Sequence, residues 1–206
     1  MPASDRAREF HRLHGAGCFV SPNPWDLGSA RLLVQLGFPA LATTSSGFAW
    51  SLGRSDNRVS LAEALGHFRA LARGVPVPVS ADFERGFADD PPGVAANVAA
   101  AAATGIAGLS IEDATGDATL PLFAFELAVA RIRAAREAID RSGTGIVLTA
   151  RSEGFIVGRP DLAETIRRLT AYAGAGADCC FAPGLRTPAD IGAVVRAAAA
   201  APGGGA

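Results

Sequence analysis

The sequence of 206 residues contains no lysine, so all nineteen of its basic residues are arginine. Schiff-base aldolases and pyridoxal phosphate enzymes need a lysine amine for covalent attachment of their substrate or cofactor. The P-loop of nucleotide-binding proteins needs a lysine as well. The absence of lysine therefore excludes all three classes.

Histidine is also scarce. His11 and His14 lie in the N-terminal segment and His67 lies in a helical pattern, so none is expected at the end of a strand. This argues against a Ser-His-Asp triad and against a histidine-rich zinc site. We interpret His67 as a surface residue or a hydrogen-bonded helix residue. Chemistry is expected from carboxylates, an arginine, hydroxyls, backbone amides and a metal ion.

There are three cysteines, Cys18, Cys179 and Cys180. An odd number with two neighbours is not a disulfide framework, and it is typical of a reducing cytoplasm. We expect all three to be small buried apolar residues. No apolar run has the length of a membrane span, and no signal peptide is recognisable at the N-terminus. The sequence therefore predicts a cytoplasmic protein that does not bind membranes.

Composition predicts one globular domain with a large core, because 49% of the residues are hydrophobic and the net charge is only -1. No basic block stands out, so nucleic acid is not an expected partner.

Short apolar runs alternate with helical patterns along the chain. The runs lie at 18–21, 40–44, 75–81, 108–111, 145–149 and 177–181, and the helical patterns at 1–14, 61–73, 94–103, 125–140, 161–173 and 188–201. This order predicts a parallel sheet whose strands are apolar throughout, and repeated units of this length favour a (β/α)8 TIM-barrel type of fold. A doubly wound open sheet is the alternative, although no Gly-x-Gly-x-x-Gly follows the first run.

Two of the apolar runs end in carboxylates. Asp82 and Glu84 follow the run that starts at Val75, and Glu112 and Asp113 follow the run that starts at Gly108. Burying an unpaired carboxylate costs on the order of several kcal/mol of free energy, so a positive charge is expected beside these groups. Because Mg²⁺ prefers oxygen ligands and keeps several waters, these strand ends predict a magnesium site.

These residues belong to a longer series of motifs by which the chain resembles the isocitrate lyase and phosphoenolpyruvate mutase superfamily. The resemblance covers roughly residues 10 to 198, and its strength lies in the order and spacing of the motifs. They are Asn23–Asp26 with Ser29–Arg31, Gly37–Gly47, Ser80–Gly86, Gly108–Asp113, Ala150–Glu153, Gly176–Asp178 and Ala182–Leu185.

The resemblance implies a (β/α)8 barrel that binds Mg²⁺, with Mn²⁺ as a possible substitute, and a small 2-oxo-acid or carboxylate. It implies that Asp82 binds the metal directly, while Glu84, Glu112 and Asp56 hold metal-bound waters. Members of the superfamily often have aspartate where this chain has Glu84.

The resemblance also implies how the substrate is held. Ser46 and Gly47 match the residues whose hydroxyl and amide bind the substrate carboxylate, Arg151 matches the arginine at the reacting end, and Trp25 lies near the floor of the site. Arg151, Ser46 and Asp56 are the candidate catalytic residues. A Mg²⁺ ion beside an enolate oxygen would stabilise the charge that develops there.

Each residue also has a purely structural interpretation. Glu112 and Asp113 are placed as acids at the start of a helix often are, and Arg151 could serve only as an ion-pair partner. Ser45–Gly47 alone is typical of a turn, and Trp25 of a core residue. Their recurrence at successive strand ends favours a site.

The chain departs from the superfamily in the stretch 113–122, which has no cysteine, histidine or lysine, and in Phe181–Gly184. In place of 113–122 the lyases carry a Lys-Lys-Cys-Gly-His motif, and the mutases carry a lysine and asparagine pattern. Near Phe181–Gly184 the mutases have a histidine and the methylisocitrate lyases a glutamate. The resemblance therefore does not identify the substrate. Three functions remain open: a Mg²⁺-dependent enzyme that cleaves a C–C bond beside a 2-oxo-acid through an enolate, an enzyme of P–C bonds in phosphonopyruvate-like substrates, and a catalytically inactive barrel.

The final expectation concerns length. The pattern predicts a single barrel domain over residues 1–201, incomplete after about six strand–helix units, and a flexible tail over 202–206. An open barrel would expose sheet edges and apolar surface. We therefore expect a homo-oligomer, or a chain of low stability.

Overall fold

The structure is a computed structural model that describes residues 3–200. The expected tail, 202–206, lies outside the described residues. The helices are α1 (Ala3–His14), α2 (Leu27–Gln35), α3 (Ser45–Ser51), α4 (Leu61–Gly74), α5 (Pro91–Ala102), α6 (Phe125–Ser142), α7 (Leu162–Gly174) and α8 (Pro188–Ala199), and the strands are β1 (Leu41–Ala42), β2 (Val79–Asp82), β3 (Gly108–Glu112), β4 (Val147–Arg151) and β5 (Cys179–Phe181).

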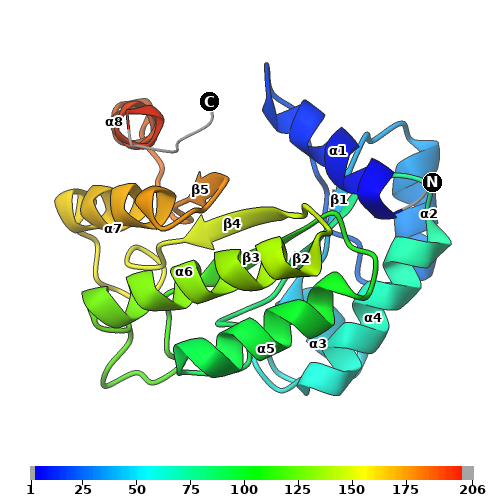
Figure 1. The fold of residues 1–206 in the computed structure, drawn as a ribbon, viewed down its shortest axis with the longest axis horizontal. Coiled ribbons are helices and arrows are strands. Elements are labelled where there is room, and N and C mark those ends of the chain that lie inside the picture. The colour runs from blue at the N-terminus through cyan, green and yellow to red at the C-terminus, as the bar shows by residue number, and fades with distance from the viewer. Residues whose placement is uncertain (1–2, 201–206) are drawn as a thin grey trace.

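All five strands are parallel and lie in the order β1-β2-β3-β4-β5. The order of the strands in the sheet is therefore their order in the chain, whereas a doubly wound sheet reverses direction at a switch point. Figure 1 shows the sheet curled, with α5 and α6 packed along its outer face. The fold is a half-barrel of the TIM-barrel type, and the open-sheet alternative is wrong.

The expected number of strands is also wrong. Residues 3–200 form five strands instead of six, because residues 18–21 form no strand. This segment runs beside β1, where the N–H of Ala42 donates one hydrogen bond to the carbonyl of Pro22 at 3.1 Å. One such bond fixes the position of a chain without forming a ladder.

The sequence predicted strands that are apolar throughout, and this prediction is wrong. Successive side chains of each strand point to opposite faces of the sheet, and the two faces differ in polarity. Outward positions such as Ala81, Leu109 and Leu148 are buried beneath the helices. The intervening positions are partly exposed and more polar: Ser80 and Asp82 in β2, Ser110 and Glu112 in β3, Thr149 and Arg151 in β4. The inner face of the half-barrel is therefore hydrophilic.

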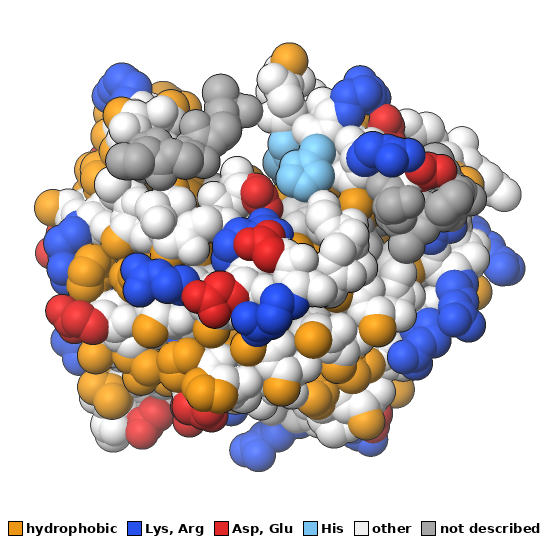
Figure 2. All heavy atoms as spheres, viewed as in Figure 1, with side chains coloured by type: hydrophobic (Ala, Val, Ile, Leu, Met, Phe, Trp, Pro, Cys, Tyr) orange, Lys and Arg blue, Asp and Glu red, His pale blue; other side chains and the backbone are white. Residues whose placement is uncertain are grey.

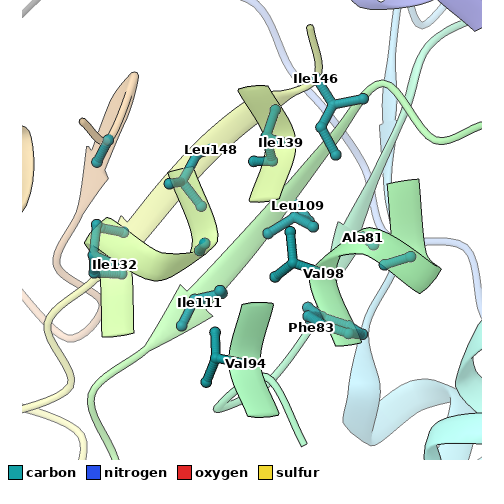
Figure 3. Close-up of a cluster of buried hydrophobic side chains, with 14 of the residues drawn as sticks. Ala81, Phe83, Val94, Val98, Leu109, Ile111, Ile132, Ile139, Ile146 and Leu148 are labelled. Carbon is teal, nitrogen blue, oxygen red and sulfur yellow. The ribbon is translucent and has the colours of Figure 1, made fainter. Parts of the chain in front are cut away.

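The core lies between the outer face of the sheet and the helices α5 and α6 (Figure 3). In Figure 3, Val98 of α5 lies beside Leu109, and Val94 of α5 points toward Ile111. Each such side chain contributes roughly 1.5–3 kcal/mol when it is fully buried. This packing supports the strands from behind and leaves their carboxyl ends free for polar side chains.

The surface of the helices carries charged side chains of both signs (Figure 2). Basic and acidic side chains lie interspersed over α6 and α7 in Figure 2, and neither sign forms a large patch on this face. No helix among residues 3–200 combines the length and the apolar character that crossing a bilayer needs.

The cysteines and His67 differ from expectation. Cys18 is exposed, Cys179 and Cys180 are half-buried, and all three are free thiols, so the predicted burial of all three is wrong. His67 is half-buried on α4, its ring stacks on Phe48 with centroids 3.9 Å apart, and its Nε2 is buried without a partner. It is therefore neither a surface nor a hydrogen-bonded residue.

Candidate active site

The carboxyl ends of three neighbouring strands bring their last charged residues together. Asp82 ends β2, Glu112 ends β3 and Arg151 ends β4, and the register pairs Glu112 directly with Arg151. All three lie on the inner face and line one open cavity of about 1170 Å³. In barrels of this kind the active site occupies this end of the sheet.

Arg151 is the centre of the cluster. Its guanidinium lies 2.9 Å from Asp82 Oδ1, 3.3 Å from Glu112 Oε2 and 2.9 Å from Glu153 Oε1. The ring of Phe181 lies 5.7 Å from its Cζ atom. The ion pairs anticipated by the structural interpretation of Arg151 are therefore present, and they hold its planar fork in one orientation.

Asp82 is fixed by the chain that leaves β1. Its Oδ2 accepts hydrogen bonds from the backbone N–H and the hydroxyl of Ser45, at 2.9 and 2.8 Å, and its own N–H donates to Thr43 Oγ1 at 2.8 Å. Each carboxylate oxygen has two lone pairs, so these contacts still leave Asp82 able to bind a cation.

Glu84 and Glu112 are held together although their charges repel. The N–H of Glu112 donates to the carbonyl of Glu84 at 3.0 Å, and Glu84 adopts a left-handed conformation with φ of 48°. A non-glycine residue in this conformation is strained, and such strain is frequent at functional sites. Burial, reinforced by the charges of Asp82 and Asp56, raises the pKa of Glu84 to about 7.

Burial also raises the pKa of Glu112, to about 8, although Arg151 acts in the opposite direction. The remaining causes are the charges of Glu153, Asp82 and Glu84. The ionised form of Glu112 is therefore disfavoured first by the loss of water around it and then by the neighbouring carboxylates.

The donors around the cavity fit a hard divalent cation. Among the described residues, six carboxylates line the cavity against a single arginine, Arg151; they are Asp56, Asp82, Glu84, Glu112, Asp117 and Glu153. No three acidic, histidine or cysteine side chains within residues 3–200 are grouped closely enough to hold a metal ion together. Mg²⁺ prefers oxygen ligands and often keeps several waters between itself and the protein.

The other predicted site residues are divided between the cavity and its surroundings. Ser46 and Asp56 line the cavity, whereas Gly47 and Trp25 do not. The hydroxyl of Thr44 caps α3 by accepting a hydrogen bond from the N–H of Gly47 at 3.2 Å. A Cβ atom at Gly47 would stand 2.5 Å from the indole of Trp25. Trp25 is 45% exposed and packs against Trp50.

Two residues around the site had no role in the sequence analysis. Ser45, beside the predicted Ser46, contacts Asp82, and Glu153, two residues after Arg151, contacts its Nε. Asp113, which was expected with Glu112 at the magnesium site, lies behind the cavity instead, 2% exposed. The alternation of strand residues could have indicated Glu153, because positions i and i+2 share a face. Nothing local distinguishes Ser45 from Ser46.

Within the stretch 113–122, where the chain departs from the superfamily, residues 114–122 form a closed loop beside the cavity. Ala114 and Leu122 form an isolated bridge, and the hydroxyl of Thr115 donates to the carbonyl of Leu120 at 2.5 Å. Gly116, Asp117 and Pro121 line the cavity. Proton transfer by a cysteine or histidine of this stretch is excluded by its composition.

Comparison with known sequences gives related proteins over most of the chain. The family described as phosphoenolpyruvate phosphomutase matches residues 10–202. An uncharacterised protein of Mycobacterium tuberculosis (strain ATCC 25618 / H37Rv) is 33% identical over 189 residues, which are 91% of this chain and 69% of that protein. Oxaloacetate decarboxylase of Bradyrhizobium diazoefficiens is 31% identical over 192 residues, 90% of this chain and 65% of that protein.

Solved structures agree with the sequence matches. A protein of Burkholderia cenocepacia J2315 described as a lyase/mutase is 47% identical, with a TM-score of 0.93 over 95% of this chain and 71% of that chain. The structure of 2,3-dimethylmalate lyase, a member of the PEP mutase/isocitrate lyase superfamily, is 29% identical in sequence. Its TM-score is 0.85 over 98% of this chain and 70% of that chain. A phosphonopyruvate hydrolase in complex with oxalate and Mg²⁺ is 30% identical in sequence, with a TM-score of 0.82 over 98% of this chain and 70% of that chain.

Proposed function

Because this chain belongs to the phosphoenolpyruvate phosphomutase family, whose relatives are lyases and mutases, we propose that it cleaves a C–C bond beside a small 2-oxo-acid. The reaction would depend on Mg²⁺, with Mn²⁺ as a substitute, and would pass through an enolate. The observation that carries the proposal is the convergence of Asp82, Glu112 and Arg151 at neighbouring strand ends of one cavity.

In this proposal Asp82 would bind the metal ion directly, and Glu84, Glu112 and Asp56 would hold it through water. The bound ion would supply positive charge where the enolate develops. The excess of carboxylates over arginine in the cavity supports this assignment.

The chain's own residues would bind and orient the substrate. Arg151 is aligned by three carboxylates, and its fork suits a substrate carboxylate. Ser46, whose hydroxyl lies 3.1 Å from Thr44 Oγ1, lines the cavity and would bind the other carboxylate. Gly47 and Trp25 would act indirectly by supporting α3, since neither lines the cavity.

An oxaloacetate-like compound is the substrate class that fits best. Its two carboxylates match Arg151 and Ser46, and the relatives include oxaloacetate decarboxylase. Without a cysteine or histidine in 114–122, water or the substrate itself would supply the proton to the enolate. The second candidate is P–C chemistry, because one structural neighbour is a phosphonopyruvate hydrolase.

Pyruvate release from a panel of 2-oxo-acids tests the proposal. We expect Mg²⁺-dependent pyruvate release from an oxaloacetate-like compound above its spontaneous rate, and its loss in Asp82→Asn. Phosphate measured in parallel with phosphonopyruvate separates the second candidate from the first. A chain that turns over none of these compounds with Mg²⁺ or Mn²⁺ would contradict the proposal and favour an inactive barrel.

A further inference from the structure

A buried polar network lies directly behind the cavity. Asp113, 2% exposed, accepts a hydrogen bond from the hydroxyl of Tyr172 at 2.7 Å and one from Arg168 Nη1 at 3.2 Å, both on its Oδ2. Tyr172 is fully buried, and Arg168 is 7% exposed. None of the three lines the cavity, so they do not contact a molecule bound there.

The network continues to the cavity through Glu153. The other oxygen of Asp113, Oδ1, accepts the backbone N–H of Glu153 at 2.8 Å. The side chain of Glu153, 4% exposed, accepts a hydrogen bond from Arg151 Nε at 2.9 Å. Tyr172 is therefore three contacts away from the guanidinium that faces the cavity.

The same residues hold both segments that flank the cavity. Arg168 Nη1 also donates to the carbonyl of Phe123 at 3.1 Å, where the stretch 114–122 enters α6. The N–H of Phe123 donates to the carbonyl of Asp113 at 2.9 Å, and the N–H of Asp113 donates to the carbonyl of Arg151 at 3.2 Å. The residues of α7 thereby connect the ends of β3 and β4 at one point.

We propose that Tyr172 and Arg168 are positioning residues, which orient Arg151 toward the substrate through Asp113 and Glu153. This inference rests on the proposed function insofar as Arg151 faces a substrate. Residues that orient a functional group commonly change activity by about 10- to 100-fold when they are altered, because a site tolerates only small displacements.

Tyr172→Phe tests the proposal, because it removes one hydroxyl and keeps the buried ring. We expect kcat to fall by ~10-fold at saturating Mg²⁺. Thr104→Val is the matched control. Thr104 is also 2% exposed, and its hydroxyl donates to the carbonyl of Ala101 at 2.7 Å, near the opposite end of β3. The control should lose comparable stability in urea and keep the wild-type kcat.

A spectroscopic readout separates this inference from the proposed function. The NMR signal of the Arg151 Nε–H, assigned by its loss in Arg151→Lys, should shift in Tyr172→Phe and in Asp113→Asn but not in Thr104→Val. In a Glu153→Gln background, Tyr172→Phe should add little further loss of kcat, because the connection is already broken.

An unchanged Arg151 signal in Tyr172→Phe would overturn the inference, and so would equal kcat losses with and without Glu153→Gln. If the wild-type chain shows no turnover, the proposed function fails while the NMR signal still decides the inference. If Tyr172→Phe does not fold, the signal in Asp113→Asn decides it.

Discussion

At the scale of single residues, the cavity combines carboxylates that repel one another with one guanidinium that attracts them. Arg151 forms ion pairs with three carboxylates, and the backbone of Glu84 adopts a left-handed conformation. Such an arrangement does not serve stability alone, because like charges and backbone strain both cost free energy. These costs support a functional interpretation of the cluster.

The half-buried imidazole of His67 gives a prediction for the pH dependence of stability. Burial lowers the pKa of His67 to about 4, whereas the unfolded chain should titrate near 6.5. The unfolded state therefore binds a proton first as the pH falls. Stability from this group is fully present above pH 6.5 and is lost progressively toward pH 4.

His67→Phe keeps the stacking on Phe48 and removes the titration. Urea unfolding at pH 7.5 and pH 4.5 should show that the wild type loses about 2 kcal/mol more than the variant, after allowance for partial exposure. Parallel losses in the two proteins would contradict the assignment of a buried neutral histidine.

At the scale of elements, the long helices were predictable and the short ones were not. The pattern at 125–140 became α6, and Asp161 caps α7 as its sequence indicates. The short helices α2, of nine residues, and α3, of seven, were not predicted, because each contains glycine and spans fewer than three turns. Their formation depends on caps and tertiary contacts, through Asp26 for α2 and Thr44 for α3.

The site was predictable to the same degree. Asp82, Glu112 and Arg151 could be placed because parallel strands bring their carboxyl ends to one edge. The contact of Ser45 with Asp82 and the burial of Asp113 against α7 could not, because both depend on the packing of segments distant in the sequence.

Two helical glycines give opposite predictions for the same substitution. In Gly47→Ala the new Cβ would stand 2.5 Å from the indole of Trp25 and 2.7 Å from the side chain of Thr44. We expect a loss of roughly 1–3 kcal/mol from this overpacking, with reduced turnover because α3 carries Ser45 and Ser46. Urea unfolding and pyruvate release measure the two effects.

Gly66→Ala is the control. Gly66 lies within α4 and has no atom within 4 Å of an added Cβ, so alanine should stabilise the protein by about 0.5–1 kcal/mol. A destabilised Gly66→Ala together with a neutral Gly47→Ala would show that α3 is not packed against Trp25 as described.

At the scale of the whole molecule, the two faces of the curled sheet and its carboxyl end differ in their contacts and in their side chains. The outer face is packed against α5 and α6 (Figure 1), the inner face carries the polar side chains, and the carboxyl ends hold the charged cluster. The edge strands β1 and β5 each pair with one neighbour among the described residues. The homo-oligomer expected from the sequence is not tested by a single chain and stays a prediction.

The most direct test of the account is calorimetric titration of oxalate, a mimic of the enolate, into the whole chain with Mg²⁺ and with a chelator. The account predicts oxalate binding that requires Mg²⁺ and that Asp82→Asn abolishes, while Gly66→Ala binds as the wild type does. Oxalate binding of equal affinity in the presence of the chelator, or in Asp82→Asn, would contradict a metal-dependent site at the ends of β2, β3 and β4.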